Sequence, residues 1–374
     1  MKQLISSIVS AFVISLAANA QEIPAKGFAV MEQGTEFQPF EFTRHAVGDD
    51  EIQIEIMYSG ICHSDLHEVK QDWFETHYPV VPGHEIAGRV VKAGKNVSKF
   101  KVGDYAGVGC MINSCRECDA CNHDREQACP KLVTTYNAKD YHHDGELTRG
   151  GYSNTIVVSQ DFAISIPANA DMSRVAPLFC AGITTYSPIR YAGVKRGDKV
   201  GVAGFGGLGH MAVQYAVALG AEVTVFDITE EKREDALRLG AVHYVNVNNP
   251  KELEGLNNTF NFILSTIPAK YDLTMYFKML AYDGQLGIVG MPALKDMPAI
   301  SLEQFVWNGN RKVFGSLIGG IKETQEMLDY SIANNIYPEV EIIQAEASAI
   351  SQAYQKVSDG KVKFRYVIDM GTIK

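Results

Sequence analysis

A glycine-rich loop between a short apolar strand and an apolar helix is the feature that most limits the fold of this chain. The run Lys199–Ala203 (KVGVA) predicts a buried strand, and a helix is expected over Met211–Leu219. In a dinucleotide-binding unit, the first glycine permits a tight turn, the second lets the backbone approach a pyrophosphate, and the third allows the helix to pack closely on the strand. The candidate coenzyme-binding residues of the loop are Gly204, Gly206, Gly207, Leu208 and Gly209.

A carboxylate follows this unit at the distance that such a fold requires. The second predicted strand, Glu222–Phe226, ends at Asp227. A carboxylate there accepts hydrogen bonds from the hydroxyls of an adenosine ribose. The alternative is that Asp227 caps a helix predicted over Glu230–Leu239, because Asp is a favoured N-cap residue. We favour the ribose role, since strand, loop, helix and second strand stand in the required order.

The same half of the chain continues with apolar runs that alternate with helical stretches such as Tyr271–Ala281. Six strands joined by crossovers predict a complete doubly wound parallel sheet, and thus an α/β fold. The four later strands are expected at His243–Asn246, Asn261–Ser265, Gln285–Gly290 and Val313–Ile318.

The N-terminal half, from Gly27 to about Ile166, has mostly β patterns. Alternation over Ile52–Tyr58 predicts a strand that leads to Cys62, and further strands are expected over 85–91, 102–109 and 152–158. These predict a compact barrel-like domain. After Gly320 a helix is expected over 321–334 and a strand over 363–370, and we expect this tail to return to the first domain.

Four residues have the chemistry of a catalytic metal site. Cys62, His84 and Glu85 stand close in the sequence, and Cys180 is the best further ligand available. Catalytic zinc usually takes three protein ligands and keeps a fourth position open. The alternative is that Cys62 is a buried small apolar residue and His84 a loop histidine with satisfied hydrogen bonds.

A second group of cysteines has spacing typical of a closed metal site. Four thiolates separated by two, two and seven residues can surround a tetrahedral zinc, and such a site is structural. The alternative is two disulfides, but adjacent cysteines at two-residue gaps have poor geometry for that pairing. Cys110 then remains as a packing residue. The four candidate ligands are Cys115, Cys118, Cys121 and Cys129.

Length and charge limit the partners. With 374 residues the chain is long enough for two or three domains. Its net charge of −10 disfavours nucleic acid or an anionic membrane surface, because both need a basic face.

Residues 1–20 are typical of a secretory signal peptide. Lys2 precedes the apolar run Leu4–Ala18, and Ala18-Asn19-Ala20 is a small-x-small pattern, which predicts cleavage before Gln21. The run is too short for a comfortable membrane span. The alternative is an amphipathic N-terminal helix packed on the fold.

Six motifs stand in one order along the chain: CHSDLH, PGHEIAGRV, GVGCMINSCRECDAC, LFCAGITTYSPIR, VGVAGFGGLGHMAVQYA and KFRYVID. Over residues 25–371 they resemble the medium-chain zinc alcohol dehydrogenases, in the cinnamyl-alcohol dehydrogenase-like branch of aldehyde reductases. The resemblance implies a GroES-like β-rich catalytic domain, a Rossmann coenzyme domain and an active cleft between them. The implied division is 1–20 for the signal peptide, 21–172 for the catalytic domain with its structural zinc lobe, 173–318 for the Rossmann domain and 319–374 for the return segment.

The resemblance also assigns roles around two zinc ions per chain. Cys62, His84 and Cys180 match catalytic zinc ligands, and Glu85 matches a carboxylate that approaches the metal. Asp65 matches the residue that orients the ligand histidine. The structural zinc ligands are matched by Cys115, Cys118, Cys121 and Cys129.

Further residues match the coenzyme and substrate sites. Thr184 matches a residue beside the nicotinamide, Lys232 one near the adenosine ribose, and Arg365 one near the coenzyme phosphates. Trp73 matches an aromatic residue of the substrate pocket, with a core tryptophan as the alternative.

The expected chemistry is hydride transfer between an alcohol carbon and the nicotinamide ring, because zinc favours the alkoxide of a bound alcohol. Ser64 is the candidate first carrier of the hydroxyl proton, and His67, expected near solvent, receives it through the coenzyme ribose. The alternative for Ser64 is the N-cap of a short helix over Asp65–Val69. We expect primary alcohols and aldehydes, aromatic or of medium aliphatic length, as substrates.

Asp227 favours NAD, because relatives that use NADPH generally carry Ser or Thr at this position. A carboxylate repels a 2′-phosphate and binds a free 2′-hydroxyl. Lys195, Lys232 and Arg233 leave room for NADP.

Three further expectations concern the protein as a whole: its function class, its oligomeric state and its location. A scaffold or binding protein that uses only the cysteine cluster is the rival function, and a zinc-free reductase of the same fold is a third. The resemblance implies a homodimer formed through the coenzyme domain. The signal peptide indicates the periplasm or secretion, whereas a soluble coenzyme and reduced cysteines suit the cytoplasm.

Overall fold

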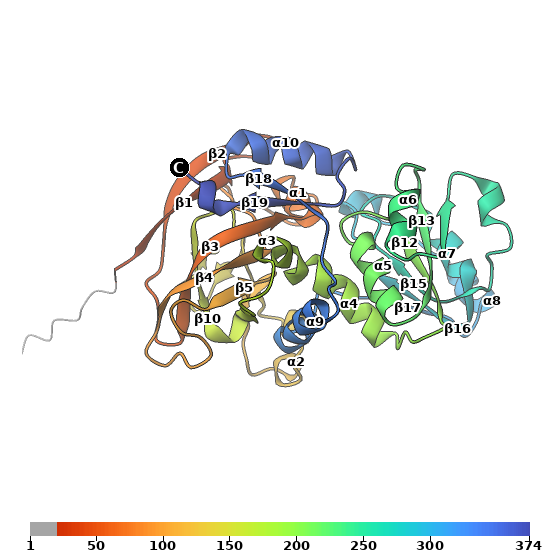
Figure 1. Cartoon of the computed structure of the whole chain (residues 1–374), viewed down its shortest axis with the longest axis horizontal. Helices are drawn as coiled ribbons and strands as arrows, with labels where there is room; N and C mark the ends of the chain where they lie inside the picture. Colours follow the sequence, from red (N-terminus) through yellow and green to blue (C-terminus); the bar gives the residue numbers. More distant parts are fainter. Residues whose placement is uncertain (1–20) are drawn as a thin grey trace, which may run out of the picture.

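The apolar runs that follow Lys199 form one sheet of six parallel strands, in the order β14-β13-β12-β15-β16-β17. The computed structural model describes residues 21–374, and in Figure 1 this sheet lies to the right. The order is that of a doubly wound nucleotide-binding sheet, as predicted. The strands are β12 (Lys199–Ala203), β13 (Glu222–Asp227), β14 (His243–Asn246), β15 (Phe260–Ser265), β16 (Leu280–Ile288) and β17 (Lys312–Gly315).

Helices connect these strands, and the bounds of three of them differ from the prediction; α6, predicted over 230–239, covers only Arg233–Arg238. Helix α5 begins at Gly209, inside the glycine-rich loop, so its N-terminus faces the loop directly. The predicted helix over 271–281 ends at Met279, because the chain continues at once into β16, which reaches back to pair Leu280 with Phe260. The helices here are α4 (Ala181–Tyr191), α5 (Gly209–Ala218), α6 (Arg233–Arg238), α7 (Leu273–Met279) and α8 (Leu302–Trp307).

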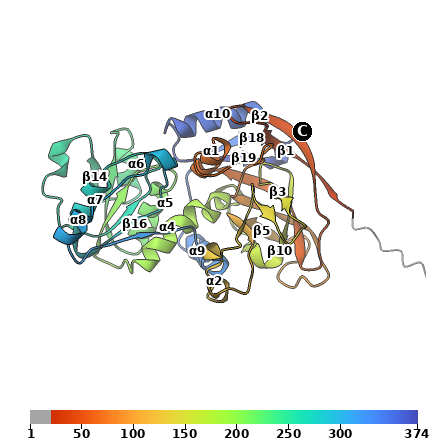
Figure 2. The same ribbon diagram turned by 180° about the vertical axis from the view of Figure 1, so that it is seen from behind.

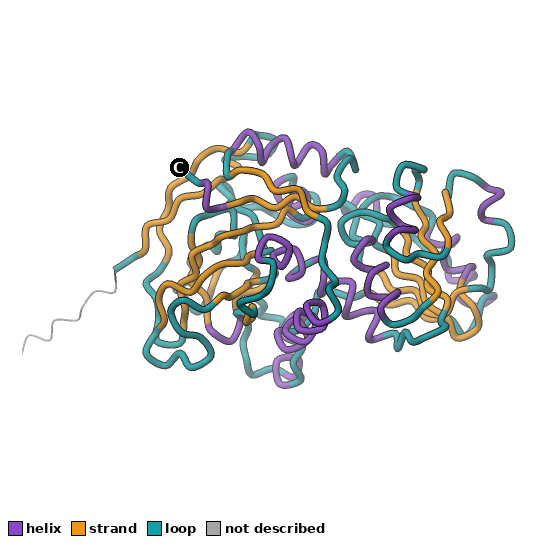
Figure 3. Tube along the Cα trace, in the orientation of Figure 1, coloured by secondary structure: helices purple, strands orange, loops and turns teal. Residues whose placement is uncertain are grey.

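The other domain is built on a second sheet, in the order β11-β5-β4-β3-β19-β18 with β10 also paired to β3. Figure 2 shows it from behind, and Figure 3 shows the predominance of strands in it. The predicted alternation appears as β3, where Ile52, Ile54 and Ile56 are buried. Its strands are β3 (Glu51–Ile61), β4 (Ile86–Ala93), β5 (Tyr105–Val108), β10 (Thr155–Ser159), β11 (Ile164–Ile166), β18 (Val340–Gln344) and β19 (Arg365–Asp369).

Short hairpins and helices complete this domain. The hairpins are formed by β1 (Ile23–Val30) with β2 (Phe37–Arg44), β6 (Met111–Asn113) with β7 (Val133–Thr134), and β8 (Lys139–Asp140) with β9 (Glu146–Leu147). The helices are α1 (His63–Val69), α2 (Asp119–Asn122), α3 (Met172–Val175), α9 (Ile321–Ala333) and α10 (Ala347–Ser358). Single 3₁₀ turns occupy Glu126–Ala128, Gln160–Phe162, Ala176–Phe179, Pro250–Leu253, Leu294–Asp296 and Met370–Thr372.

The C-terminal segment returns to the first domain after the coenzyme sheet is complete. Strand β19 lies antiparallel to β3 and pairs Tyr366 with Ile61, one residue before Cys62. In Figure 1 the blue strands β18 and β19 accordingly lie beside the orange β3. This pairing places Arg365 next to the residues that follow β3 and precede β4.

The predicted signal peptide, residues 1–20, lies outside the described residues. Within residues 21–374, no helix combines the length and the apolar character that a membrane crossing demands.

Candidate active site

Cys62, His84, Glu85 and Cys180 come together at a buried point where three segments meet. Cys62 follows β3 and precedes α1, His84 and Glu85 immediately precede β4, and Cys180 precedes α4. One potential ligand atom from each lies within 4.8 Å of the others, and all four residues are buried. The two sulfur atoms are 3.8 Å apart. Because Zn–S bonds are about 2.3 Å long, two thiolates on a tetrahedral zinc lie about 3.8 Å apart. The arrangement therefore fits zinc. The alternative, that His84 is a loop histidine with satisfied hydrogen bonds, does not explain why the four potential ligand atoms lie together.

Asp65 holds two members of this cluster in place. Its carboxylate accepts hydrogen bonds from His84 Nδ1 at 3.0 Å and from the backbone N–H of Cys62 at 2.9 Å. The hydroxyl of Tyr152 also donates to it, at 3.1 Å. With Nδ1 occupied, His84 presents Nε2 to the cluster, which is the usual arrangement of a ligand histidine.

Glu85 connects the cluster to Arg365. The guanidinium of Arg365 donates to Oε1 of Glu85, and both side chains are buried. Burial raises the pKa of Glu85 to about 7, while the positive charge of Arg365 opposes that shift. The other carboxylate oxygen, Oε2, has no hydrogen-bond partner within residues 21–374. An unpaired buried oxygen beside two thiols is suited to a metal ion.

A pocket of about 870 Å³ opens beside the cluster, between the two domains. Cys62, Ser64 and His67 line one side, and the glycine-rich loop from Gly204 to Leu208 lines the other. Its size suits a cofactor with a small substrate. The cluster that contains Cys62 therefore faces the glycine-rich loop across one cavity.

The glycines of the loop have the properties that the fingerprint requires. Gly204 has φ +88°, which only glycine adopts easily. A Cβ on Gly206 would point into open space, whereas a Cβ on Gly209 would overlap the carbonyl oxygen of Gly204. The backbone at Gly206 can thus approach a ligand, and Gly209 permits close packing of α5 on β12. The residues fit a dinucleotide.

Asp227 is tied to the glycine loop itself. Its Oδ2 accepts from the N–H of Phe205 at 2.8 Å, and its Oδ1 accepts from the N–H of Ile228 at 2.7 Å. The helix-capping alternative is wrong, because α6 starts only at Arg233 and its N-cap is Lys232. Asp227 and Lys232 both line the pocket.

Arg233 lies differently from our expectation. Its guanidinium bonds to Glu230 at 2.7 Å and to Glu252 at 3.0 Å, and Arg233 is absent from the pocket lining within the described chain. It is therefore engaged elsewhere, whereas Lys232 lines the pocket.

Ser64 and His67 both lie on α1 and line the pocket. The N-cap alternative for Ser64 is wrong, because the helix starts at His63 and Cys62 occupies the N-cap position. The expectation that His67 lies near solvent is also wrong: it is 7% exposed and its Nδ1 contacts Asp72 at 2.8 Å.

Trp73 lies in the pocket wall, and the core alternative is wrong. It is half-buried, its ring lies 4.6 Å from that of His67, and its Nε1 donates to the carbonyl of Pro292 at 3.0 Å. This hydrogen bond crosses from the β-rich domain to the coenzyme domain. Thr184 lies on α4, one turn after Cys180, outside the pocket lining, with a buried hydroxyl unpaired in the described structure.

His63 and Tyr152 are residues that the sequence reasoning missed. His63 lines the pocket, and burial together with the nearby His67 lowers its pKa to about 4. Its position inside CHSDLH, between two assigned residues, was the available signal. Tyr152 contacts Asp65 from 87 residues away, and no local pattern marks that contact.

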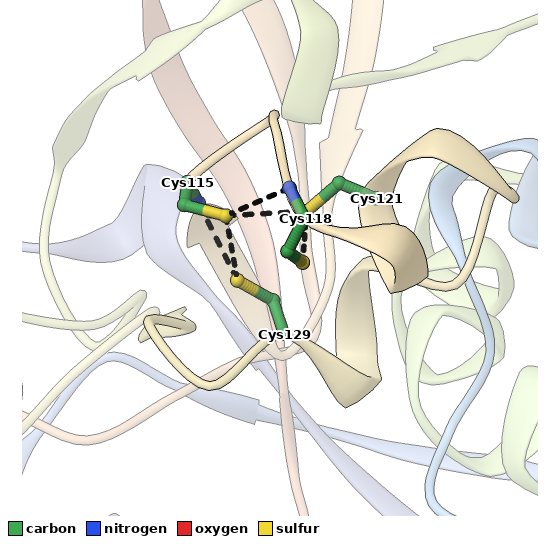
Figure 4. Close-up of side chains that lie close together, drawn as sticks. All are labelled: Cys115, Cys118, Cys121 and Cys129. Carbon is green, nitrogen blue, oxygen red and sulfur yellow. Dashed lines mark hydrogen bonds between the residues drawn. The ribbon is translucent and has the colours of Figure 1, made fainter.

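The second cysteine group forms a compact cluster on the lobe that contains α2, and none of its members lines the pocket. Figure 4 shows the four side chains close together. Cys115 lies 3.4 Å from Cys129 and 3.9 Å from Cys121, measured between sulfur atoms, and Cys118 lies 3.5 Å from Cys121. All seven cysteines are free. The disulfide alternative is wrong, because a disulfide needs sulfurs about 2.05 Å apart. Backbone N–H groups of Cys118 and Lys131 point at the sulfurs, which suits thiolates.

Two family models match the chain. Residues 48–168 match the alcohol dehydrogenase GroES-like domain, and residues 207–332 match the zinc-binding dehydrogenase model. The two-domain fold, the pocket between the domains and both matches define a dehydrogenase of the zinc-binding class.

Individual relatives identify the branch of this class to which the chain belongs. Cinnamyl alcohol dehydrogenase 2 of Rauvolfia serpentina is 44% identical over 93% of this chain and 96% of its own length. NADP-dependent alcohol dehydrogenase C 1 of Mycolicibacterium smegmatis is 46% identical over 89% and 94%. The crystal structure of CAD from Helicobacter pylori complexed with NADP(H) is 51% identical, with a TM-score of 0.91, and covers 95% of this chain and 100% of that one. The chain belongs to the medium-chain alcohol dehydrogenase family, in the cinnamyl alcohol dehydrogenase branch, and is an alcohol–aldehyde oxidoreductase.

Proposed function

We propose that this enzyme reduces aldehydes, and oxidises primary alcohols, with a nicotinamide coenzyme at a zinc centre. The observation that carries the proposal is the position of Cys62, His84 and Cys180 beside a pocket whose opposite wall is the glycine loop. These three residues would hold the ion, and Asp65 fixes the orientation of His84. Zinc bound there supplies Lewis acidity toward the oxygen of the substrate.

The residues of the chain provide a route for the proton. Ser64 lies in the pocket with its hydroxyl oxygen 3.6 Å from the sulfur of Cys62. It would give a proton to the aldehyde oxygen during reduction and take it back during oxidation. His67 would restore that proton to Ser64, and Asp72 holds His67 in position through Nδ1.

A second zinc would be bound by the four cysteines of the lobe. All four positions of a tetrahedral ion are filled by thiolates, so this site has no room for substrate and serves stability. The full protein would then contain two zinc ions in cysteine-containing sites. The scaffold alternative predicts one ion there, and the relatives give it no support.

The substrate class follows from the apolar part of the pocket. Trp73 lies there beside His67, and Met291 precedes Pro292, whose carbonyl accepts from Trp73; both line the pocket and suit the body of an aromatic or medium-length aliphatic aldehyde. The name of the Rauvolfia relative, a cinnamyl alcohol dehydrogenase, supports an aromatic substrate.

NAD is the proposed coenzyme, although two similar proteins are named for NADP. The charge of Asp227 supports NAD, because a buried carboxylate at the ribose end repels a 2′-phosphate. Arg233 is paired with Glu230 and Glu252, which removes one candidate phosphate ligand. Lys232 is the group that favours NADP.

A homodimer is proposed through the edge of the coenzyme sheet. Strand β17 is the edge strand, and Leu302, Val306 and Trp307 on the neighbouring α8 are each more than 70% exposed. Such an apolar surface next to a free strand edge suits a second copy. The molar mass in solution tests this.

Export is proposed from the pattern of residues 1–20 alone. Cleavage before Gln21 would give a periplasmic or secreted enzyme. N-terminal sequencing of the protein isolated from its source separates this from retention in the cytoplasm, which would leave the segment uncut.

The test of the proposed function is a screen of aromatic and aliphatic aldehydes with NADH and NADPH on purified protein. Zinc is measured on the same sample. Turnover of no aldehyde by zinc-replete protein would contradict the proposal.

A further inference from the structure

The hydroxyl of Tyr152 belongs to a chain of buried side chains that ends at the proposed zinc ligand His84. Tyr354 on α10 donates a hydrogen bond to the hydroxyl oxygen of Tyr152 at 3.2 Å, and Tyr152 donates to Oδ2 of Asp65 at 3.1 Å. Oδ1 of Asp65 faces Nδ1 of His84 at 3.0 Å. The chain therefore connects the C-terminal return segment to a residue of the cluster that contains Cys62.

Asp65 uses both of its carboxylate oxygens in this arrangement. Besides His84, Oδ1 accepts from the N–H of Gly83 at 3.3 Å, and besides Tyr152, Oδ2 accepts from the N–H of Cys62 at 2.9 Å. A carboxylate has about four lone-pair sites, so these donors fix the plane of the group. Three of them belong to the ligand segments themselves. Tyr152 is far from those segments in sequence and holds the carboxylate from outside.

The ring and backbone of Tyr152 support the loop before His84 independently of the hydroxyl. Gly83 has φ +104°, and a Cβ at that position would lie 2.6 Å from Cδ1 of Tyr152. The N–H of Tyr152 also donates to the carbonyl of Pro82 at 3.0 Å. Tyr152→Phe keeps these contacts, so it isolates the contribution of the hydroxyl group that bonds to Asp65.

Tyr354 supports the hydroxyl of Tyr152 from the side opposite to Asp65. The ring of Phe37 lies 4.7 Å from that of Tyr354 and 5.9 Å from that of Tyr152, measured between centroids. Burial, with the nearby charge of Asp65, holds the pKa of both tyrosines well above the ordinary value of a phenol. Both hydroxyls therefore remain proton donors. A donor bonded to the oxygen of Tyr152 polarises its O–H group and strengthens the next hydrogen bond in the chain.

We infer that Tyr152 is a positioning residue for the proposed catalytic zinc. Its hydroxyl, supported by Tyr354, fixes the carboxylate of Asp65, so that His84 presents Nε2 to the ion in one orientation. Tyr152 does not line the pocket, so it acts through Asp65 and contacts neither substrate nor coenzyme. The inference rests on the proposed function, because it requires zinc at the cluster that contains Cys62.

The first experiment measures zinc affinity instead of turnover. Zinc-loaded full-length enzyme without coenzyme is titrated with a competing chelator, and the step that Cys62→Ser lacks identifies the ion at the cluster. Loss of an outer partner of a ligand histidine costs about 10–100-fold in metal affinity, and we expect Tyr152→Phe to weaken this step by roughly tenfold. Tyr354→Phe should weaken it less. The ion at the cysteine lobe should be held equally by all variants.

Tyr215→Phe is the matched control. Tyr215 is fully buried, its hydroxyl lies 2.8 Å from Oγ of Ser331, and it does not line the pocket. The control therefore loses a buried phenol hydrogen bond, as Tyr152→Phe does, yet it should hold both zinc ions as tightly as the unmutated protein. An equal loss of zinc affinity in Tyr152→Phe and Tyr215→Phe would reflect lost stability alone and would overturn the inference.

The second experiment asks whether Tyr152 acts through Asp65. In an Asp65→Ala background, Tyr152→Phe should cause little further loss of zinc affinity, because the acceptor of its hydroxyl is gone and the two changes are coupled. The same fold-loss in both backgrounds would show that Tyr152 acts by another route, and it would overturn the inference.

The outcomes separate this inference from the proposed function. Equal zinc release by the unmutated protein and Cys62→Ser would contradict the proposed zinc centre, and the inference with it. An ion that Cys62→Ser loses but Tyr152→Phe holds normally would overturn the inference alone. Should Tyr152→Phe not fold, Tyr354→Phe provides the test, because it removes the supporting bond and leaves Tyr152 in place. Unchanged zinc affinity in that variant would then overturn the inference.

Discussion

Arg365 and Glu85 form a buried ion pair that joins the coenzyme side of the pocket to the metal-type cluster. Arg365 opens β19, and a Cβ placed on Gly207 would meet its Nη1 at 2.8 Å. The guanidinium of Arg365 therefore contacts the carboxylate of Glu85 and also lies against the glycine-rich loop. The charge beside the loop is therefore already paired with Glu85.

This pair gives the first prediction. Arg365→Met leaves Glu85 buried without a counter-charge, so the free energy of unfolding should fall by about 3–5 kcal/mol. The double variant Arg365→Met/Glu85→Gln should recover part of that loss, because no buried charge remains. Denaturant unfolding of the two variants and of Glu85→Gln measures the coupling. Equal stabilities of the single and double Arg365 variants would contradict it.

The second prediction concerns the proposed catalytic ligands. Cys62→Ser and His84→Ala should abolish aldehyde reduction while the coenzyme domain stays folded, since neither residue belongs to that sheet. His243→Asn is the control, because His243 is exposed at the start of β14 and does not belong to the ligand cluster, and it should keep most of its turnover. Turnover, zinc content and coenzyme binding are measured together. Normal turnover by Cys62→Ser with full zinc would remove the site assignment.

The third prediction distinguishes the cysteine lobe from the active site. Cys118→Ser should lower the thermal midpoint and the zinc content, because a closed thiolate site contributes to folding. The rate constant for hydride transfer in the remaining folded protein should stay close to that of the unmutated enzyme. A zinc-replete variant with an unchanged midpoint would contradict the structural role.

The fourth prediction tests the proton route. Ser64→Ala should slow aldehyde reduction by roughly 10²–10⁴-fold, the usual range for the loss of a general acid–base group. Ser64→Thr keeps the hydroxyl and should restore much of the rate. Single-turnover measurements with one aromatic aldehyde isolate the chemical step. An unchanged rate in Ser64→Ala would exclude this hydroxyl from the mechanism.

The fifth prediction concerns the coenzyme. Two hydrogen bonds from a ribose diol to the charged Asp227 are worth roughly 1.5–3 kcal/mol each, so NADH should exceed NADPH by at least tenfold in kcat/KM. Asp227→Asn is the sharper variant, because it removes the charge yet keeps an acceptor for the N–H of Phe205. It should erase most of the preference.

Asp227→Ser removes the charge and that acceptor together. A lower free energy of unfolding in Asp227→Ser than in Asp227→Asn would measure how much Asp227 stabilises the glycine-rich loop. That effect is separate from its effect on the coenzyme preference. A preference of the unmutated enzyme for NADPH would refute the ribose role.

Local patterns predicted the parallel sheet and the glycine loop, because each rests on residues that are close in sequence. The position of β12 and the need for a glycine at 204 could be read directly from KVGVAGFGG. The hydrogen bond from Phe205 to Asp227 depends on the pairing of β12 with β13, so the local pattern predicts only a carboxylate at the strand end.

Long-range contacts explain what the sequence could not predict. His67 is expected near solvent from its place at the end of the proton route, but Trp73 covers it. His143 lies 92 positions after Glu51, and no motif brings them together until the β8–β9 hairpin is placed beside β3. The chemistry of the ligand set makes Cys180 the best further ligand, but 118 residues separate it from Cys62, so no local pattern shows that the two sulfur atoms lie close together.

The pairing of β19 with β3 has a consequence for the order in which the protein is made. The coenzyme sheet is continuous in sequence from β12 to β17, so it can fold while the ribosome is still adding residues. The β-rich domain starts first, yet it lacks β18 and β19 until the entire coenzyme sheet has been synthesised. Throughout that interval Glu85 has no Arg365 beside it. The domain that begins the chain is therefore the last to be completed, and its metal-type cluster gains its cationic partner only after the nucleotide-binding half already exists.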